Sequence, residues 1–326
     1  MSSAASSWAR LAESLRFDGL WWRKMVYLGS VYGPEWLKRC APPAVATIIF
    51  ILVKRARRGA LDNMRHIITP PNPWPVRLAA LRMFSTFAHC LAETVEQYGP
   101  HPPPVTLELR QRDPLAEALQ EGGGAILVTG HFGNWDIVAN QLRDYGRPIN
   151  VVMAREPNIT TQGYVRQMRE QAGVQIIYSD ASVFSSVNII RALQRNEIVA
   201  MQLDRPMGAG GMRSIPFFGV PASFPSGPFV LARLSGAPLI PVFIPRLGVR
   251  HYAIRVRGPF RLARQARDGR ALERVMADVV AAFEEIIREY PTQWFQFSPF
   301  WPSEAGAAVT PPAEEVQLPA RSRGRG

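Results

Sequence analysis

The chain has 326 residues, of which 47% are hydrophobic and 20% charged, so its composition predicts a globular protein and excludes a disordered one. Its formal net charge of +12 favours anionic partners, namely nucleic acid, anionic lipid surfaces or acidic proteins. The two cysteines, Cys40 and Cys90, exclude a disulfide framework and a CxxC metal pair, and they favour a reduced, cytosolic environment.

Residues 1–98 are expected to be mostly helical. The segment at 74–99 repeats apolar residues at helical spacing and stops at Gly99-Pro100. The longest apolar run, residues 41–53, is shorter than the roughly 20 residues that a spanning helix needs. Basic residues frame this run on both sides, and Trp36 precedes it, which is typical of a segment that lies at a bilayer interface. A buried core helix with a solvated basic end is the alternative.

After a proline-rich linker at 99–105, strand-like and helix-like runs alternate. This alternation predicts an α/β fold, with a mostly parallel central sheet flanked by helices, over residues 99–301. The N-terminal helices are expected to pack on this domain as a membrane-associating region. Residues 302–326 lack periodicity and are expected to be disordered. The predicted strands are 125–130, 149–154, 174–179, 198–203, 238–245 and 251–257, and a last helix is predicted at 270–289.

A histidine follows the predicted strand at 125–130 directly, in the sequence HFGNWD. Active sites of α/β sheets form beyond the carboxyl ends of the strands, where His131 is placed. If His131 lies in a turn that Gly133 permits, and Asp136 in the first turn of a helix, the carboxylate can bond one ring nitrogen and leave the other as a base. The alternative is a strand-end histidine with an aspartate that serves the helix N-terminus. No GxSxG elbow occurs, so a substrate hydroxyl or amine is the expected nucleophile.

Four blocks in order resemble one known family. HFGNWD looks like the H-x4-D/E block of the glycerolipid and lysophospholipid acyltransferase superfamily, and most closely that of the bacterial lauroyl/myristoyl acyltransferases of lipid A biosynthesis. The blocks VMAREPN at 152–158, MQLDRPMGAGGMRSIPFFGVPASFPSGPFVLARLSGAPLIPVF at 201–243 and YPTQWFQFSPFWP at 290–302 are similar to further segments of that branch. The sequence departs from the branch where Phe224 stands in place of a small hydroxyl residue, and where the basic pair after the closing Trp is absent.

The resemblance implies roles for individual residues. His131 would be the general base and Asp136 would orient it. Arg155 is the first candidate for stabilising the oxyanion of the acyl thioester, and the amides of Gly133 and Asn134 are others. Asp204 and Arg205, at the end of the strand 198–203, would either position the acceptor or form a structural ion pair. Three residues are candidates for lining an acyl channel, although core packing explains them almost as well: Phe217, Phe218 and Phe224.

The reaction implied is transfer of a fatty acyl chain from acyl-carrier protein or acyl-CoA to a lipid or glycolipid acceptor, at the cytoplasmic face of a bacterial inner membrane. The basic charge suits an acidic carrier protein and anionic lipid. No cofactor, metal site or nucleic-acid motif is expected. A thioesterase or lipid hydrolase that uses the same pair on water, and a non-enzymatic basic membrane-binding protein, are the alternatives. The acceptor and the acyl chain length stay open.

Overall fold

The computed structural model describes residues 20–109, 113–138, 142–154, 173–179, 183–205, 211–263 and 269–302. Arg155 and nearly all of the predicted disordered tail lie outside these residues.

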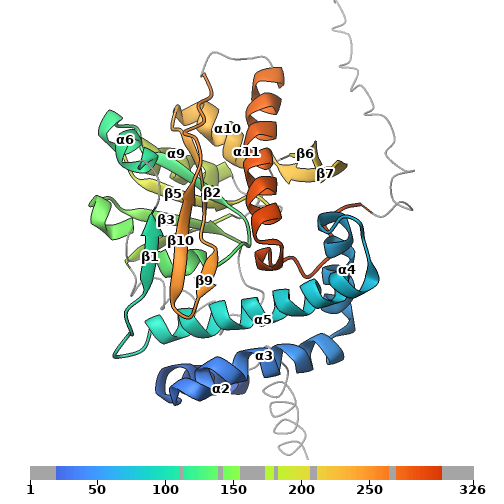
Figure 1. The fold of residues 1–326 in the computed structure, drawn as a ribbon. Coiled ribbons are helices and arrows are strands. Elements are labelled where there is room, and N and C mark those ends of the chain that lie inside the picture. The colour runs from blue at the N-terminus through green and yellow to red at the C-terminus, as the bar shows by residue number, and fades with distance from the viewer. Residues whose placement is uncertain are drawn as a thin grey trace, which may run out of the picture.

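The N-terminal part of the described chain is helical, as the sequence predicted. It forms α2 (Leu20–Tyr32), α3 (Glu35–Leu52), α4 (Lys54–Ile67) and the long α5 (Pro73–Gln97). Asn72 starts α5, because its side chain accepts a hydrogen bond from the Trp74 amide at 3.1 Å and a proline follows at the first helical position. In Figure 1, α5 runs beneath the sheet and α11, and α2 and α3 run below α5.

The apolar run at 41–53 forms most of α3. Among the described residues, no single helix is both long and apolar enough to cross a membrane. Helices α3 and α4 meet those criteria only as a pair, and they are bent by 98° at Val53.

The centre of the protein is a sheet of eight strands, mainly parallel. Its order is β1-β10-β8-β2-β5-β3-β4, with β9 beside β10, and only the pairs β10–β8 and β10–β9 are antiparallel. The strand positions confirm the alternating pattern of the sequence. The strands are β1 (Thr106–Leu109), β2 (Ala125–Thr129), β3 (Ile149–Met153), β4 (Val174–Tyr178), β5 (Ile198–Gln202), β8 (Leu239–Phe243), β9 (Arg246–Gly248) and β10 (His251–Val256).

The two faces of the sheet carry different helices. On one face, Ile126 and Val128 of β2 belong to a large core that includes residues of α9 (Val183–Gln194), α10 (Gly227–Ser235) and α11 (Gly269–Glu289). On the other face, Leu127 belongs to a smaller core with α6 (Pro114–Glu121). This division follows from the two-residue period of a strand. The segment 212–225 folds as a separate hairpin of β6 (Met212–Phe217) and β7 (Val220–Pro225), which is paired antiparallel.

Candidate active site

The HFGNWD loop leaves the sheet at its middle, because β2 lies between β8 and β5. Gly133 has a left-handed backbone with φ of +58°, and a Cβ atom there would lie 1.9 Å from the carbonyl oxygen of Ile244. Only glycine fits this close approach, as the sequence predicted for the turn. Asp136 follows in the first turn of the short helix η1 (Trp135–Val138).

Backbone hydrogen bonds hold the loop on both sides. The Gly133 amide donates to the carbonyl of Gln293 at 2.9 Å, and the Asn134 amide donates to the carbonyl of Ile244 at 2.9 Å. These contacts correct the expectation that the two amides stabilise an oxyanion, because each N–H already has a carbonyl partner. The amide of Phe295 donates in turn to the carbonyl of His131 at 2.7 Å.

The carboxylate next to His131 is Asp204. Its Oδ1 atom lies 2.8 Å from Nδ1 of the imidazole, and its Oδ2 atom accepts the backbone N–H of His131 at 2.8 Å. The side chain of Asp204 is fully buried, whereas that of His131 is 14% exposed. The pair therefore has a closed side at the carboxylate and an open side at the imidazole.

A third donor reaches Asp204 from Trp294, whose indole Nε1–H donates to Oδ2 at 2.8 Å. Burial alone would raise the pKa of Asp204, but the charge of His131 and the hydrogen bonds from His131 and Trp294 outweigh burial and hold this pKa below its ordinary value. The carboxylate is therefore ionised at neutral pH and can only accept hydrogen bonds. It follows that Nδ1 of His131 carries a proton, which leaves Nε2 of the neutral ring free to accept one.

The predicted roles of the acidic residues change with this geometry. The sequence assigned Asp204 to the acceptor or to an ion pair with Arg205, but the structure places it beneath His131 with both oxygens engaged. Asp136 and Arg205 line the same cavity as His131, and Arg205 is exposed at its rim. The orienting role of Asp136 stays a prediction, and Arg155 lies outside the described residues.

An apolar cavity of about 370 Å³ adjoins His131. It lies over the sheet face opposite α11, and the strand registers arrange its floor in layers. The layer next to His131 contains Thr129 and its register partner Gln202, and the layer below it contains Leu127, Ala200 and Val151. The volume is within the range of small-molecule sites, and the lining suits an alkyl chain.

The prediction that the phenylalanines at 217–224 line an acyl channel is wrong for Phe217 and Phe224, which are fully buried. Phe217 and Phe224 have no exposed surface, because they pack edge to face with centroids 5.2 Å apart in an aromatic core. Phe218 has a positive φ of 52°, and Arg288 lies over its ring at 4.7 Å. None of the three lines the cavity beside His131. Core packing, the alternative considered for this segment, accounts for Phe217 and Phe224.

Residues of α5 and β10 hold the HFGNWD loop through the side chain of Asn134. The Asn134 side chain donates to the carbonyl of Cys90 and to the hydroxyl of Tyr252, both at 3.1 Å. That hydroxyl donates to the buried Glu93 carboxylate, which also accepts from Arg246 at 2.6 Å. The loop is thereby tied to a helix that also contacts the N-terminal helices.

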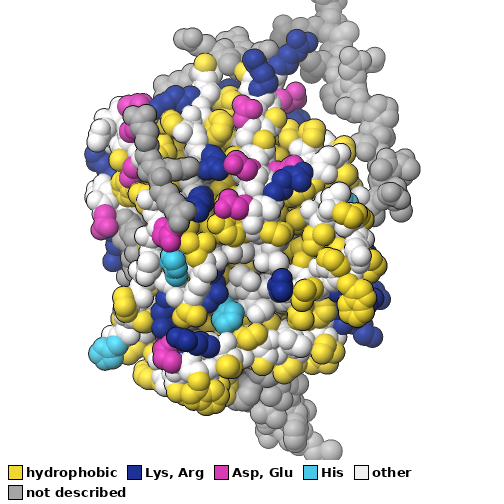
Figure 2. Space-filling view, viewed as in Figure 1, with side chains coloured by type: hydrophobic (Ala, Val, Ile, Leu, Met, Phe, Trp, Pro, Cys, Tyr) yellow, Lys and Arg dark blue, Asp and Glu magenta, His cyan; other side chains and the backbone are white. Residues whose placement is uncertain are grey.

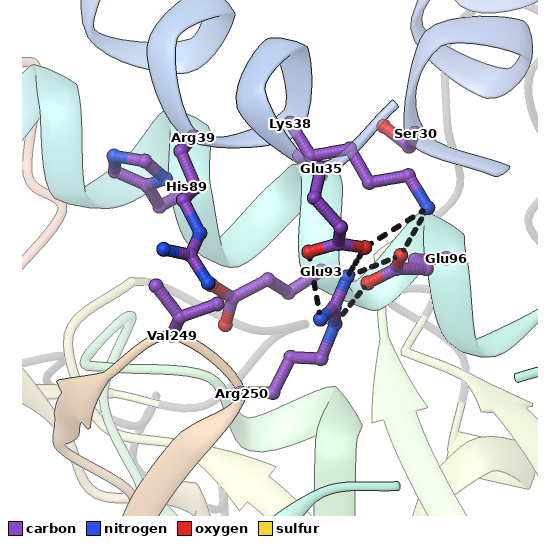
Figure 3. A pocket seen from close by; sticks show the side chains of 10 residues that line it. Ser30, Glu35, Lys38, Arg39, His89, Glu93, Glu96, Val249 and Arg250 are labelled. Carbon is purple, nitrogen blue, oxygen red and sulfur yellow. Dashed lines mark hydrogen bonds and ion pairs between the residues drawn. The ribbon is translucent and has the colours of Figure 1, made fainter. Parts of the chain in front are cut away.

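Figure 3 shows the neighbouring ion cluster that joins those helices to the sheet. Glu96 of α5 pairs with Lys38 of α3 at 2.6 Å and with Arg250 at 2.7 Å. Arg250 also pairs with Glu35 of α3 at 2.8 Å. Because its members come from α3, α5 and the turn before β10, this cluster fixes the N-terminal helices against the body that carries the loop.

Sequence reasoning missed the roles of Gln293 and Trp294. The Gln293 side chain bridges the backbone of Arg246, accepting from its amide at 2.7 Å and donating to its carbonyl at 2.8 Å. The resemblance of the block at 290–302 was the available signal, but it carried no role for either residue. Among the described residues, no group of three or more His, Cys, Asp or Glu side chains is arranged to hold a metal ion.

Comparisons with known proteins point to one family of enzymes. A family model described as bacterial lipid A biosynthesis acyltransferase matches residues 15–303. Phosphatidylinositol mannoside acyltransferase of Mycolicibacterium smegmatis is 28% identical over 201 residues, which are 60% of this chain and 62% of that protein. The protein of the same name from Mycobacterium tuberculosis is 28% identical over 191 residues, 58% of each chain. The chain thus spans about three fifths of the length of these curated relatives.

A solved structure, the 1-acyl-sn-glycerophosphate acyltransferase PlsC of Thermotoga maritima, aligns with 12% identity and a TM-score of 0.35. The alignment covers 77% of this chain and 96% of that one.

Proposed function

This chain belongs to the bacterial lipid A biosynthesis acyltransferase family, and on that premise we propose that it moves a fatty acyl chain from an acyl thioester to a hydroxyl or amine of a lipid or glycolipid. The observation that carries the proposal is the pair of His131 and Asp204, 2.8 Å apart, with the imidazole at an apolar cavity. A base without an enzyme nucleophile suits direct attack by the acceptor.

In the proposed reaction, Nε2 of His131 takes the proton of the acceptor hydroxyl while the oxygen of that hydroxyl bonds to the thioester carbonyl carbon. The tetrahedral adduct then collapses, which re-forms the carbonyl and breaks the C–S bond. The departing thiolate takes the proton from the imidazolium, so the ring returns to its starting state. We assign Asp204 the task of orienting the ring and stabilising its charge. Asp136 is the competing carboxylate, and Arg155 is the proposed oxyanion donor.

The acyl chain is proposed to lie in the cavity over the sheet, with its carbonyl at His131 and its tail toward Ala200 and Val151. The apolar lining supports this, because each buried CH₂ group contributes roughly 0.8 kcal/mol. Arg205, exposed at the rim, is proposed to contact the acceptor head group. The curated relatives are named for a mannosylated inositol lipid, so a glycolipid is the first acceptor to try.

The protein is proposed to act at the cytoplasmic face of a bacterial inner membrane, where soluble acyl-carrier protein or acyl-CoA is available. The support is an apolar stripe on the outer side of α3, formed by Val45, Ile48 and Ile51, which are exposed by 44 to 59%. Their spacing places them on one helix face. Figure 2 shows hydrophobic side chains along the lower edge of the molecule, over α2 and α3. Exposed patches of this kind favour an interfacial position.

The direct test uses radiolabelled hexadecanoyl thioesters of acyl-carrier protein and of CoA. Each is incubated with the purified protein in detergent and with one acceptor: a phosphatidylinositol mannoside, phosphatidylinositol, a tetra-acylated lipid A precursor, or none. We expect label to enter one of the glycolipids. Label released as free fatty acid whatever the acceptor would instead identify a thioesterase. Unchanged donor in every reaction would favour the non-enzymatic, membrane-binding alternative.

A further inference from the structure

Trp294 contacts Asp204 and the backbone next to His131, and it is not among the residues that line the cavity. Its ring is fully buried, and its indole N–H donates to Oδ2 of Asp204 at 2.8 Å. Its backbone pairs with Phe132, the residue after His131, in an isolated antiparallel bridge. The position of the indole is therefore fixed relative to the loop from two directions.

The two oxygens of Asp204 are used unequally. Oδ2 accepts two donors, the backbone N–H of His131 and the indole N–H of Trp294. Oδ1 accepts only the imidazole N–H of His131 among the described contacts. Two donors at Oδ2 fix the rotation of the carboxylate group and draw its negative charge away from the oxygen that faces the ring.

Resting on the proposed function, we infer that Trp294 is a positioning residue that sets the alignment and the basicity of His131 through Asp204. Without the indole donor, Oδ2 keeps only the backbone N–H of His131. More negative charge then faces the imidazole, which favours its protonated form, so the ring titrates at higher pH. The carboxylate also rotates more freely, so the ring is aligned less often.

Other charged or titratable groups near His131 do not change in this comparison. Asp136, Arg205 and Tyr98 line the same cavity, on η1, after β5 and after α5. Trp294 itself is not among the residues that line this cavity, and its indole donates to Asp204. A shift on replacing Trp294 is therefore transmitted by Asp204.

The chain offers a matched control in Trp301. Its indole is also buried in the aromatic core, with its ring centroid 5.9 Å from that of Trp294 at an interplanar angle of 90°. Its Nε1–H donates to the backbone carbonyl of Phe217 at 3.3 Å and not to Asp204. Trp301→Phe thus removes one buried indole hydrogen bond from the same core and leaves the pair untouched.

The experiment compares full-length wild type, Trp294→Phe and Trp301→Phe in detergent, with circular dichroism to verify folding. Acyl transfer gives kcat, KM and the pH–rate profile. Histidine ¹⁵N NMR, with the His131 signal assigned from its loss in His131→Gln, gives the titration of the ring independently of activity. For Trp294→Phe we expect kcat to fall roughly tenfold with KM little changed. We also expect the acidic limb of the pH–rate profile and the midpoint of the His131 NMR titration to move up by about half a pH unit.

Trp301→Phe should leave the midpoint at the wild-type value. A folded Trp294→Phe protein with a wild-type midpoint, or equal shifts in both variants, would overturn the inference. If the wild type transfers no acyl chain, the proposed function is rejected. If the His131 midpoint is nevertheless shifted in Trp294→Phe and not in Trp301→Phe, the inference about Trp294 and Asp204 is retained. The two failures are therefore distinguishable.

Discussion

Asp204 Oδ1 and His131 Nδ1 are 2.8 Å apart although the residues are 73 positions apart in the sequence. The reason is the register of two neighbouring parallel strands, in which Thr129 of β2 is opposite Gln202 of β5. His131 and Asp204 each follow that pair by two residues, so they leave the same edge of the sheet together. The imidazole and the carboxylate are thus brought together by strand pairing and not by a local motif.

Replacing Gly133 by alanine should displace the loop. The new Cβ would meet the Ile244 carbonyl at 1.9 Å, and the left-handed backbone adds roughly 1–2 kcal/mol of strain. Because a shift of about 1 Å at a catalytic group can lower the rate on the order of 10²-fold, we expect a loss of that size in kcat/KM. Gly146→Ala is the control, since Gly146 has φ of +63° but open space at its Cβ. Equal activity of the two variants would show that the close approach is unimportant.

Filling the cavity floor should change the acyl chain that is accepted. Ala200 lies between Leu127 and Val151 in the strand register, so Ala200→Phe places a ring across the second layer. Transfer of a hexadecanoyl chain should fall roughly tenfold or more, while a short chain such as octanoyl is transferred as before. Competition between the two donors measures this preference within one protein sample. An unchanged ratio would place the acyl chain elsewhere.

A charge on the α3 stripe should weaken membrane binding. Ile48→Glu replaces a 53% exposed apolar side chain with an anion. The variant loses the roughly 1.5–3 kcal/mol gained by burying the isoleucine in the membrane interface, and anionic lipid repels the new carboxylate. Binding to vesicles of phosphatidylethanolamine and phosphatidylglycerol should fall at least about tenfold in a flotation assay. Val249→Glu, at a 43% exposed site in the β9–β10 turn, should bind as the wild type does. Equal binding of both variants would remove α3 from the interface.

The sequence predicted the helical N-terminal region and the alternating strands because both depend on local periodicity. The final helix, predicted at 270–289, is α11 at Gly269–Glu289. Strands such as β3 at Ile149–Met153 also match closely, since buried strands read as continuous apolar runs.

The partner of His131 could not be read from spacing in the sequence. The HFGNWD block points to Asp136, which is near in the chain, whereas Asp204 is adjacent to His131 only through the β2–β5 pairing. For Phe217 and Phe224, the sequence leaves both an acyl channel and core packing open, because an apolar segment does not reveal whether it lines a cavity or fills a core. The cavity floor at Ala200 depends on how the other segments pack on that face of the sheet, which the residues of a strand do not specify.

The ion cluster of Glu96 should contribute stability that depends on pH. Burial alone would raise the pKa of Glu96, but hydrogen bonds from Arg250 and Lys38 hold it below the ordinary value. A carboxyl pKa lower in the folded state stabilises the protein above the unfolded value near 4.5, and this contribution is lost as pH falls below it. Glu96→Gln should lower the free energy of unfolding by about 3 kcal/mol at pH 7, and by less at pH 4.

Urea unfolding of the wild type and the variant at both pH values measures this difference. Glu285→Gln is the control, because its pair with Arg257 is largely exposed and is worth less than about 1 kcal/mol. Equal destabilisation by the two variants would mean that the cluster does not fix the N-terminal helices.

The decisive measurement is a double-mutant analysis of acyl transfer, with His131→Ala, Asp204→Asn and Asp136→Asn alone and in pairs, each verified as folded. His131→Ala should lose roughly 10²–10⁴-fold in rate. Asp204→Asn should also lose most of the rate, because the ring loses its anion and its tautomer is no longer fixed. The His131→Ala/Asp204→Asn variant should be little worse than His131→Ala, since an orienting group then has nothing to orient. Full transfer by a folded His131→Ala protein would contradict the assignment of this pair. So would a wild-type rate in Asp204→Asn together with a His131→Ala/Asp136→Asn double variant that is little worse than His131→Ala.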